Sequence, residues 1–78
     1  MMPGANNEVL LIITKSGKIH DMNIHQQKNG TWTATVIFDV NGILKYETIT
    51  KTKRDSAFRS ACEFVRKNID EFAYVHSL

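Results

Sequence analysis

The sequence predicts an α+β fold, with an antiparallel sheet of three to four strands packed on one C-terminal helix. Short β-branched runs separated by turn residues fill the first two thirds of the chain, and one longer run with apolar residues three and four apart follows. With 78 residues the chain has room for one core. We therefore expect a single α+β domain over residues 8–78, preceded by a disordered leader over residues 1–7.

The first two strands are expected over Val9–Thr14 and Ile19–Gln26, joined by a turn that contains Gly17. The first run is continuously apolar and β-branched, whereas the second alternates. One face of the second strand would carry His20, Met22 and Ile24, and the other Asp21, Asn23 and His25.

A second hairpin is predicted around Asn41-Gly42, the strongest short turn signal in the chain. Before it, Trp32, Ala34, Val36 and Phe38 alternate with polar or β-branched residues, as in a half-buried strand. The return strand is expected over Ile43–Lys51. A three-residue loop, Val40 to Gly42, would place Leu44 and Tyr46 on the buried Trp32 face and the lysines opposite. We prefer this register to a two-residue turn, which mixes apolar and charged groups on one face.

A helix is expected after Thr52, which would cap it together with Asp55. Its apolar stripe would lie on the Trp32 face of the sheet, and the helix would end near Asp70 or Phe72. The stripe consists of Phe58, Ala61, Cys62, Val65, Ile69 and Phe72. The pattern assigns no structure to the apolar tail over 73–78.

Several classes of function are disfavoured by the composition. The single cysteine, Cys62, cannot form an internal disulfide, and no run is long enough for a signal core or a membrane span, so we expect a cytoplasmic protein and no membrane partner. The three histidines, His20, His25 and His76, lack the spacing of metal ligands. No base is positioned beside a nucleophile, so we expect no catalytic residue, no cofactor and no enzymatic activity.

Positive charge is concentrated late in the chain. The formal net charge is +2, yet residues 43–67 hold seven basic and three acidic residues, a net charge of +4. Lys53 and Arg54 stand at the expected helix N-terminus, where free amides and the macrodipole favour a phosphate. A solvated face of mixed charge is the alternative explanation.

The pattern Gly30-Thr31-Trp32, Asn41-Gly42 and Thr52-Lys53-Arg54, followed by a helix with Ala57 and Ala61, resembles the N-terminal arm-binding domain of phage-type tyrosine integrases, which is AP2-like. The resemblance covers about half of the chain. It implies a protein of a phage or mobile element whose exposed sheet face enters the DNA major groove. Thr52-Lys53-Arg54 also resembles the helix start in the C-terminal half of double-stranded-RNA-binding domains.

These observations predict a small nucleic-acid-binding accessory protein, with DNA favoured over RNA, that uses the exposed sheet face and the helix N-terminus. The alternative is a protein-interaction or dimerisation module, such as an inhibitor of a host protein, without nucleic-acid binding. Its apolar tail would dock on a second subunit of a homodimer. The expected nucleic-acid contacts are Thr33, Thr35, Lys45, Lys51, Lys53 and Arg54.

Overall fold

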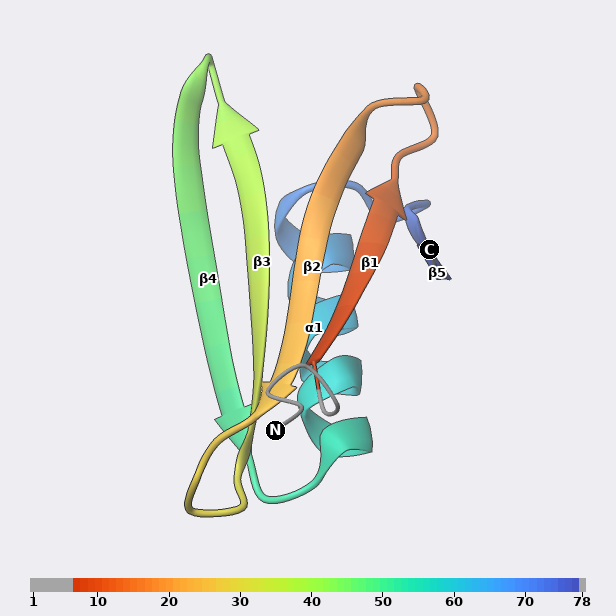
Figure 1. Cartoon of the computed structure of the whole chain (residues 1–78). Coiled ribbons are helices and arrows are strands. Elements are labelled where there is room, and N and C mark those ends of the chain that lie inside the picture. Colours follow the sequence, from red (N-terminus) through yellow and green to blue (C-terminus); the bar gives the residue numbers. More distant parts are fainter. Residues whose placement is uncertain (1–6, 78) are drawn as a thin grey trace.

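Over the described residues, five antiparallel strands form one layer and a single helix forms the other (Figure 1). The computed structural model describes residues 7–77. The strand order in the sheet is β4-β3-β2-β1-β5, and every neighbouring pair is antiparallel. The elements are β1 (Asn7–Ile13), β2 (Ile19–Gln26), β3 (Trp32–Val40), β4 (Ile43–Lys51), α1 (Arg54–Asn68) and β5 (Tyr74–Ser77). The predicted α+β class and the C-terminal helix are confirmed.

The fifth strand is the main addition to the predicted fold. After α1 the chain turns at Asp70, whose carboxylate accepts hydrogen bonds from the backbone N–H groups of Lys15 and Phe72. β5 then pairs with β1, with Ile13 opposite Tyr74. The structure pairs residues 74–77 with β1 of the same chain, and their docking on a second subunit stays a prediction.

The core lies between the sheet and α1. Its largest fully buried side chains, on the central strands, are Ile12, Met22, Ile24 and Val36. The helix contributes small residues, Ala57 and Ala61, at no exposed area. Small side chains let the helix backbone approach the sheet closely, so this short chain buries a continuous apolar layer. As predicted, His20 and Asp21 lie on opposite faces of β2, and the structure buries the His20 face while Asp21 is exposed.

The register of the β3–β4 hairpin differs from the predicted one. Asn41 and Gly42 both have positive φ, 53° and 83°, and form a two-residue turn that pairs Val40 with Ile43. Two left-handed residues match the right-handed twist of the flanking strands, and this local preference sets the pairing. The three-residue loop is therefore wrong. Phe38 lies opposite Lys45, and Ile37 opposite Tyr46.

The charged residues of β4 tolerate this register because β4 is an edge strand. Lys45 and Lys51 share the helix-side face with Phe38 and Trp32, yet both remain exposed. In Figure 1 the tip of the β3–β4 hairpin also extends beyond the end of α1. The pattern of apolar and charged residues was therefore not a reliable guide to the register. Neither the three-residue loop nor the two-residue turn buries a charge at this edge.

The ends of the predicted segments shift slightly. Lys53, not Thr52, is the N-cap of α1, and no side chain caps the helix there. The helix ends at Asn68, earlier than expected, with Ile69 as the C-cap. Residue 7, expected in the leader, opens β1. The rest of the expected leader, residues 1–6, lies outside the described residues, as does residue 78.

Candidate interaction surface

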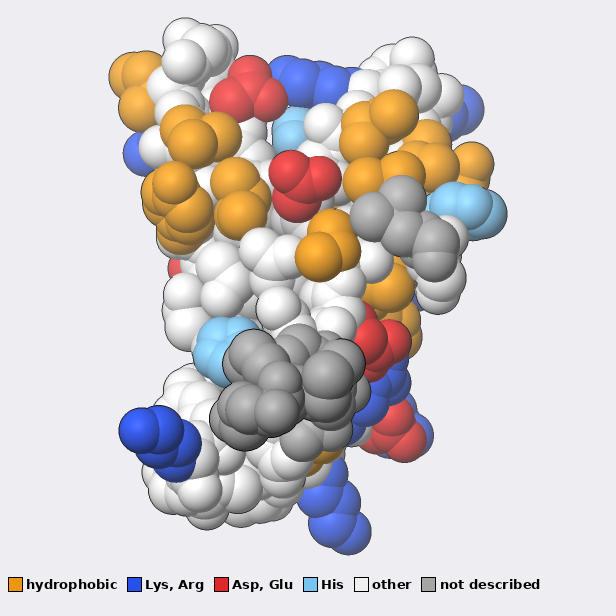
Figure 2. All heavy atoms as spheres, in the orientation of Figure 1, with side chains coloured by type: hydrophobic (Ala, Val, Ile, Leu, Met, Phe, Trp, Pro, Cys, Tyr) orange, Lys and Arg blue, Asp and Glu red, His pale blue; other side chains and the backbone are white. Residues whose placement is uncertain are grey.

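The sheet face that points away from α1 is called the outer face here, and it is the side seen in Figure 2. Its residues follow from the register, because side chains of paired residues lie on the same face of a sheet. The outer-face positions of the four long strands are Asn7, Val9, Leu11, Ile13, Ile19, Asp21, Asn23, His25, Thr33, Thr35, Ile37, Asp39, Leu44, Tyr46, Thr48 and Thr50. β5 adds Tyr74 and His76. No lysine or arginine occupies any of these positions.

One half of the outer face is apolar, in two groups (Figure 2). The first, called the β4 group, consists of Ile37, Leu44 and Tyr46 on β3 and β4. Leu44 is 58% exposed and Tyr46 62% exposed. Sequence reasoning placed these two side chains in the core, and the two-residue turn is what moves them to the outer face.

The second group, called the β1 group, lies over β1, β2 and β5. It consists of Leu11, Ile13, Ile19 and Tyr74. Ile19 is 57% exposed. Acidic side chains, seen in red in Figure 2, separate the two groups, and the register places Asp21 beside Ile37.

Asp39, at the end of this acidic row, is bound within the protein. The Lys18 ammonium lies 2.9 Å from its carboxylate, and the largely buried His20 has Nδ1 at 3.9 Å. The hydrogen bond from Lys18 lowers the pKa of Asp39 below its ordinary value. Lys18 therefore neutralises one acid at the rim, whereas Asp21 is exposed and forms no ion pair within residues 7–77.

The other half of the outer face is polar and rich in threonine. Thr33 is only 3% exposed, and its hydroxyl lies within hydrogen-bond distance of Gln27 and, at 3.1 Å, of Thr50. Its hydrogen-bonding capacity is therefore used inside the protein. Thr35, also predicted as a contact, is half-buried opposite Thr48.

The six predicted nucleic-acid contacts do not share one surface. Thr33 and Thr35 lie on the outer face, whereas Lys45 and Lys51 lie on the helix side of β4. The prediction that the lysines extend outward beside the threonines is wrong, since it depended on the three-residue loop. Whether any of the six binds nucleic acid stays a prediction.

Lys53 and Arg54 lie together at the N-terminus of α1, as predicted, but only Arg54 forms ion pairs within the described residues. Arg54 Nε lies 2.6 Å from a carboxylate oxygen of Glu8 on β1, and Nη1 lies 3.2 Å from Asp55. The hydrogen bond to Glu8 raises the pKa of the Arg54 guanidinium. Arg54 thus connects the helix to the sheet, whereas Lys53 is exposed and forms no ion pair within residues 7–77.

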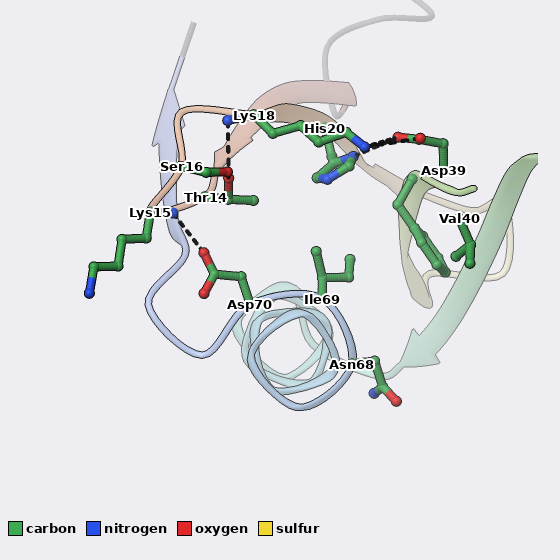
Figure 3. A pocket seen from close by; sticks show the side chains of 11 residues that line it. Thr14, Lys15, Ser16, Lys18, His20, Asp39, Val40, Asn68, Ile69 and Asp70 are labelled. Atoms are coloured by element: carbon green, nitrogen blue, oxygen red, sulfur yellow. Dashed lines mark hydrogen bonds and ion pairs between the residues drawn. The ribbon is translucent and has the colours of Figure 1, made fainter. Parts of the chain in front are cut away.

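A pocket of about 480 Å³ opens where the end of α1 meets the β1–β2 and β3–β4 turns (Figure 3). Several of its polar groups bind one another. The Thr14 and Ser16 hydroxyls lie 3.0 Å apart, and the Lys15 backbone N–H donates to Asp70 over 2.6 Å. The first of these bonds lies within the turn after β1, and the second fastens that turn to the segment that follows α1, which is a structural role.

Neither the cysteine nor a cluster of metal-binding side chains forms a site among the described residues. Cys62 is buried in the core, and desolvation raises the pKa of its thiol, as in an unreactive packing cysteine. Among residues 7–77 no three His, Cys, Asp or Glu side chains form a group that could hold a metal ion.

No protein-family model, curated protein or solved structure matches the chain. Within residues 7–77 the helix is too short and too polar to cross a membrane. The surface that remains as a candidate site is the apolar half of the outer face, and in particular the β4 group beside the open edge of the sheet.

Proposed function

We propose that this protein is a protein-interaction module that acts as a homodimer, with the β4 group as part of its contact surface. The observation that carries the proposal is the outer face itself, which is apolar over one half and has no lysine or arginine at its strand positions. Contiguous apolar side chains on a sheet face are typical of contact surfaces, because exposing them to water is unfavourable.

A second copy of the chain fits the β4 group better than an unrelated partner would. Among residues 7–77, β4 has a strand on one side only, so a row of backbone groups that no described strand pairs borders Leu44 and Tyr46. A second copy presents the same edge and the same side chains, and a two-fold axis would cover both at once. A domain of this size also has a small core, so association would add stability that folding alone does not supply.

Analytical ultracentrifugation tests the proposal. The chain has a mass of 8.9 kDa, and we expect twice that mass at micromolar concentration. Leu44→Glu should give a folded monomer, because it places a charge in the contact. The matched control is Ile19→Glu, which puts the same charge on an equally exposed residue of the β1 group and should stay dimeric. A wild-type monomer, or a dimeric Leu44→Glu, contradicts the proposal.

Nucleic-acid binding is our second proposal, and two observations near the start of α1 favour it. Lys51 and Lys53 are exposed near the start of α1, and neither forms an ion pair within the described residues. The N-terminal amides of α1 also lack a side-chain cap, so a phosphate would meet both lysines and free N–H groups.

Fluorescence anisotropy with duplex DNA, single strands and RNA at low salt tests this second proposal. The double variant Lys51→Ala, Lys53→Ala should weaken binding and reduce the slope of log K against log salt by about two. Lys67→Ala, near the opposite end of α1, is the control and should have little effect. Absence of binding to all three probes removes the proposal.

A further inference from the structure

The backbone groups and side chains of β4, at the open edge of the sheet, favour one particular pairing with a second strand. We infer that two copies of the chain pair through β4, antiparallel, with Tyr46 of each copy opposite Tyr46 of the other on a two-fold axis. The inference rests on the proposed homodimer and specifies its geometry. It predicts one continuous ten-stranded sheet with both helices on the same side.

The hairpin decides which backbone groups are available. Across the two-residue turn, Val40 and Ile43 form the first hydrogen-bonded pair of β3 and β4. Hydrogen-bonded pairs alternate along an antiparallel ladder, so Leu44, Tyr46 and Thr48 direct their N–H and C=O groups away from β3. With Tyr46 on the axis, Leu44 lies opposite Thr48 of the second copy. The available groups of the two edges therefore meet one another.

The charges on β4 favour this register over those with the axis on either adjacent residue. Lys45 and Glu47 flank Tyr46 on the helix side of β4. With Tyr46 on the axis, each Lys45 faces Glu47 of the other copy. Moving the axis to Lys45 would oppose two lysines, and moving it to Glu47 would oppose two glutamates. Like charges directly opposite are unfavourable in a sheet, whereas opposite charges are favourable.

The same register covers the most exposed apolar side chains of the hairpin. On the outer face Tyr46 would pack against its counterpart and Leu44 would lie beside Thr48 of the second copy, so that the two β4 groups meet across the axis at the paired tyrosines. On the helix side Ile43, which is 63% exposed, would lie opposite Ile49 of the second copy. A single pairing thus satisfies the backbone edge, both charges and three apolar side chains.

The other edge of the sheet is less suited to this pairing. β5 spans only Tyr74–Ser77, four residues, against nine in β4. Charged side chains on a natural edge strand usually prevent pairing. On β4 they are placed so that one register converts them from repulsive to attractive, and this is why we assign the dimer contact to β4.

Disulfide cross-linking tests the register. Tyr46→Cys places a thiol on the axis, where the two Cα atoms of a hydrogen-bonded pair lie about 5.5 Å apart, and mild oxidation should give a covalent dimer. Thr48→Cys is the control, since its two copies would lie about 14 Å apart, and it should stay uncross-linked. The double variant Leu44→Cys, Thr48→Cys retains Tyr46 and should cross-link although neither single variant does.

Charge exchange supplies an independent test. Lys45→Glu alone and Glu47→Lys alone should each raise the dissociation constant about ten-fold at low salt, since each replaces two favourable pairs by two unfavourable ones. The double exchange, Lys45→Glu with Glu47→Lys, should restore wild-type affinity.

A monomeric wild type would remove the proposed function and this inference together. A dimer in which Tyr46→Cys and the double-cysteine variant fail to cross-link, or charge exchange fails to restore affinity, overturns the register alone.

Discussion

Ile19 and Ile24 lie on the same strand and differ only in the face they occupy. Ile24 is fully buried under α1, whereas Ile19 is 57% exposed on the outer face. Truncating a buried isoleucine removes its transfer free energy and leaves a cavity, and truncating an exposed one removes little of either. The effect of a substitution on stability is therefore governed by the face of the sheet on which the residue lies.

Ile24→Ala is accordingly expected to lower the free energy of unfolding by about 2–5 kcal/mol. Ile19→Ala, the same chemical change on the other face, should lower it by less than about 1 kcal/mol. Urea unfolding followed by circular dichroism measures both. Equal losses for the two variants would show that the outer face is as buried as the core.

We expect Asp70 to make the stability depend on pH. Backbone N–H donors from Lys15 and Phe72 lower the pKa of its carboxyl below the ordinary value of 3.8. A lowered pKa in the folded state means that the stabilisation is complete above the ordinary value and is lost as the pH falls through the folded value.

Asp70→Asn should therefore be less stable than wild type at neutral pH and should lose less stability on acidification below about pH 4. Urea unfolding at neutral and acidic pH measures the difference. Glu71→Gln, which changes an exposed neighbour, is the control and should follow the wild-type curve. A wild-type pH dependence in Asp70→Asn would contradict this role.

At the scale of elements, α1 begins without a side-chain cap. Lys53 has the extended conformation of an N-cap residue, with φ −127° and ψ 148°, but its side chain cannot accept from the helix amides. Lys53→Ser should raise the free energy of unfolding by about 1 kcal/mol, because its hydroxyl can accept one of those N–H groups. Thermal unfolding measures the gain, and Lys53→Ala should show none of it.

At the scale of the whole molecule, the proposed dimer links folding to association. Any contact made only by the folded state stabilises it by mass action, so the melting temperature should depend on protein concentration. We expect a rise of about 5 °C or more over a hundred-fold increase in concentration. Leu44→Glu should abolish this dependence, and a wild-type melting temperature that is constant over that range would argue against the dimer.

Much of the fold could be predicted because the turn residues and the alternation of apolar residues indicate the same strands. β2 and the return strand β4 have the predicted bounds, and the alternation from Trp32 to Phe38 correctly identified the buried face of β3. β5 could not be predicted. Its residues carry no clear strand pattern, and they form a strand only because β1 offers an open edge.

The residues of the candidate surface could not be predicted from the sequence, for one physical reason. Moving the β3–β4 pairing by one residue exchanges the two faces of β4, and here the exchange put Leu44 and Tyr46 outside and Lys45 and Lys51 on the helix side. The signal that could have found the correct register was Asn41-Gly42 itself, whose preference for a two-residue turn is local and strong.

By itself the sequence determined the fold class, the helix, the buried face of β3 and the position of the Asn41-Gly42 turn, because periodicity and turn chemistry act over a few residues. Only the tertiary structure decided the face that each β4 side chain occupies, the pairing of the C-terminal segment with β1 and the ion pair between Glu8 and Arg54. These features depend on contacts between distant segments, and an edge strand leaves its own pattern too weakly constrained to specify them in advance.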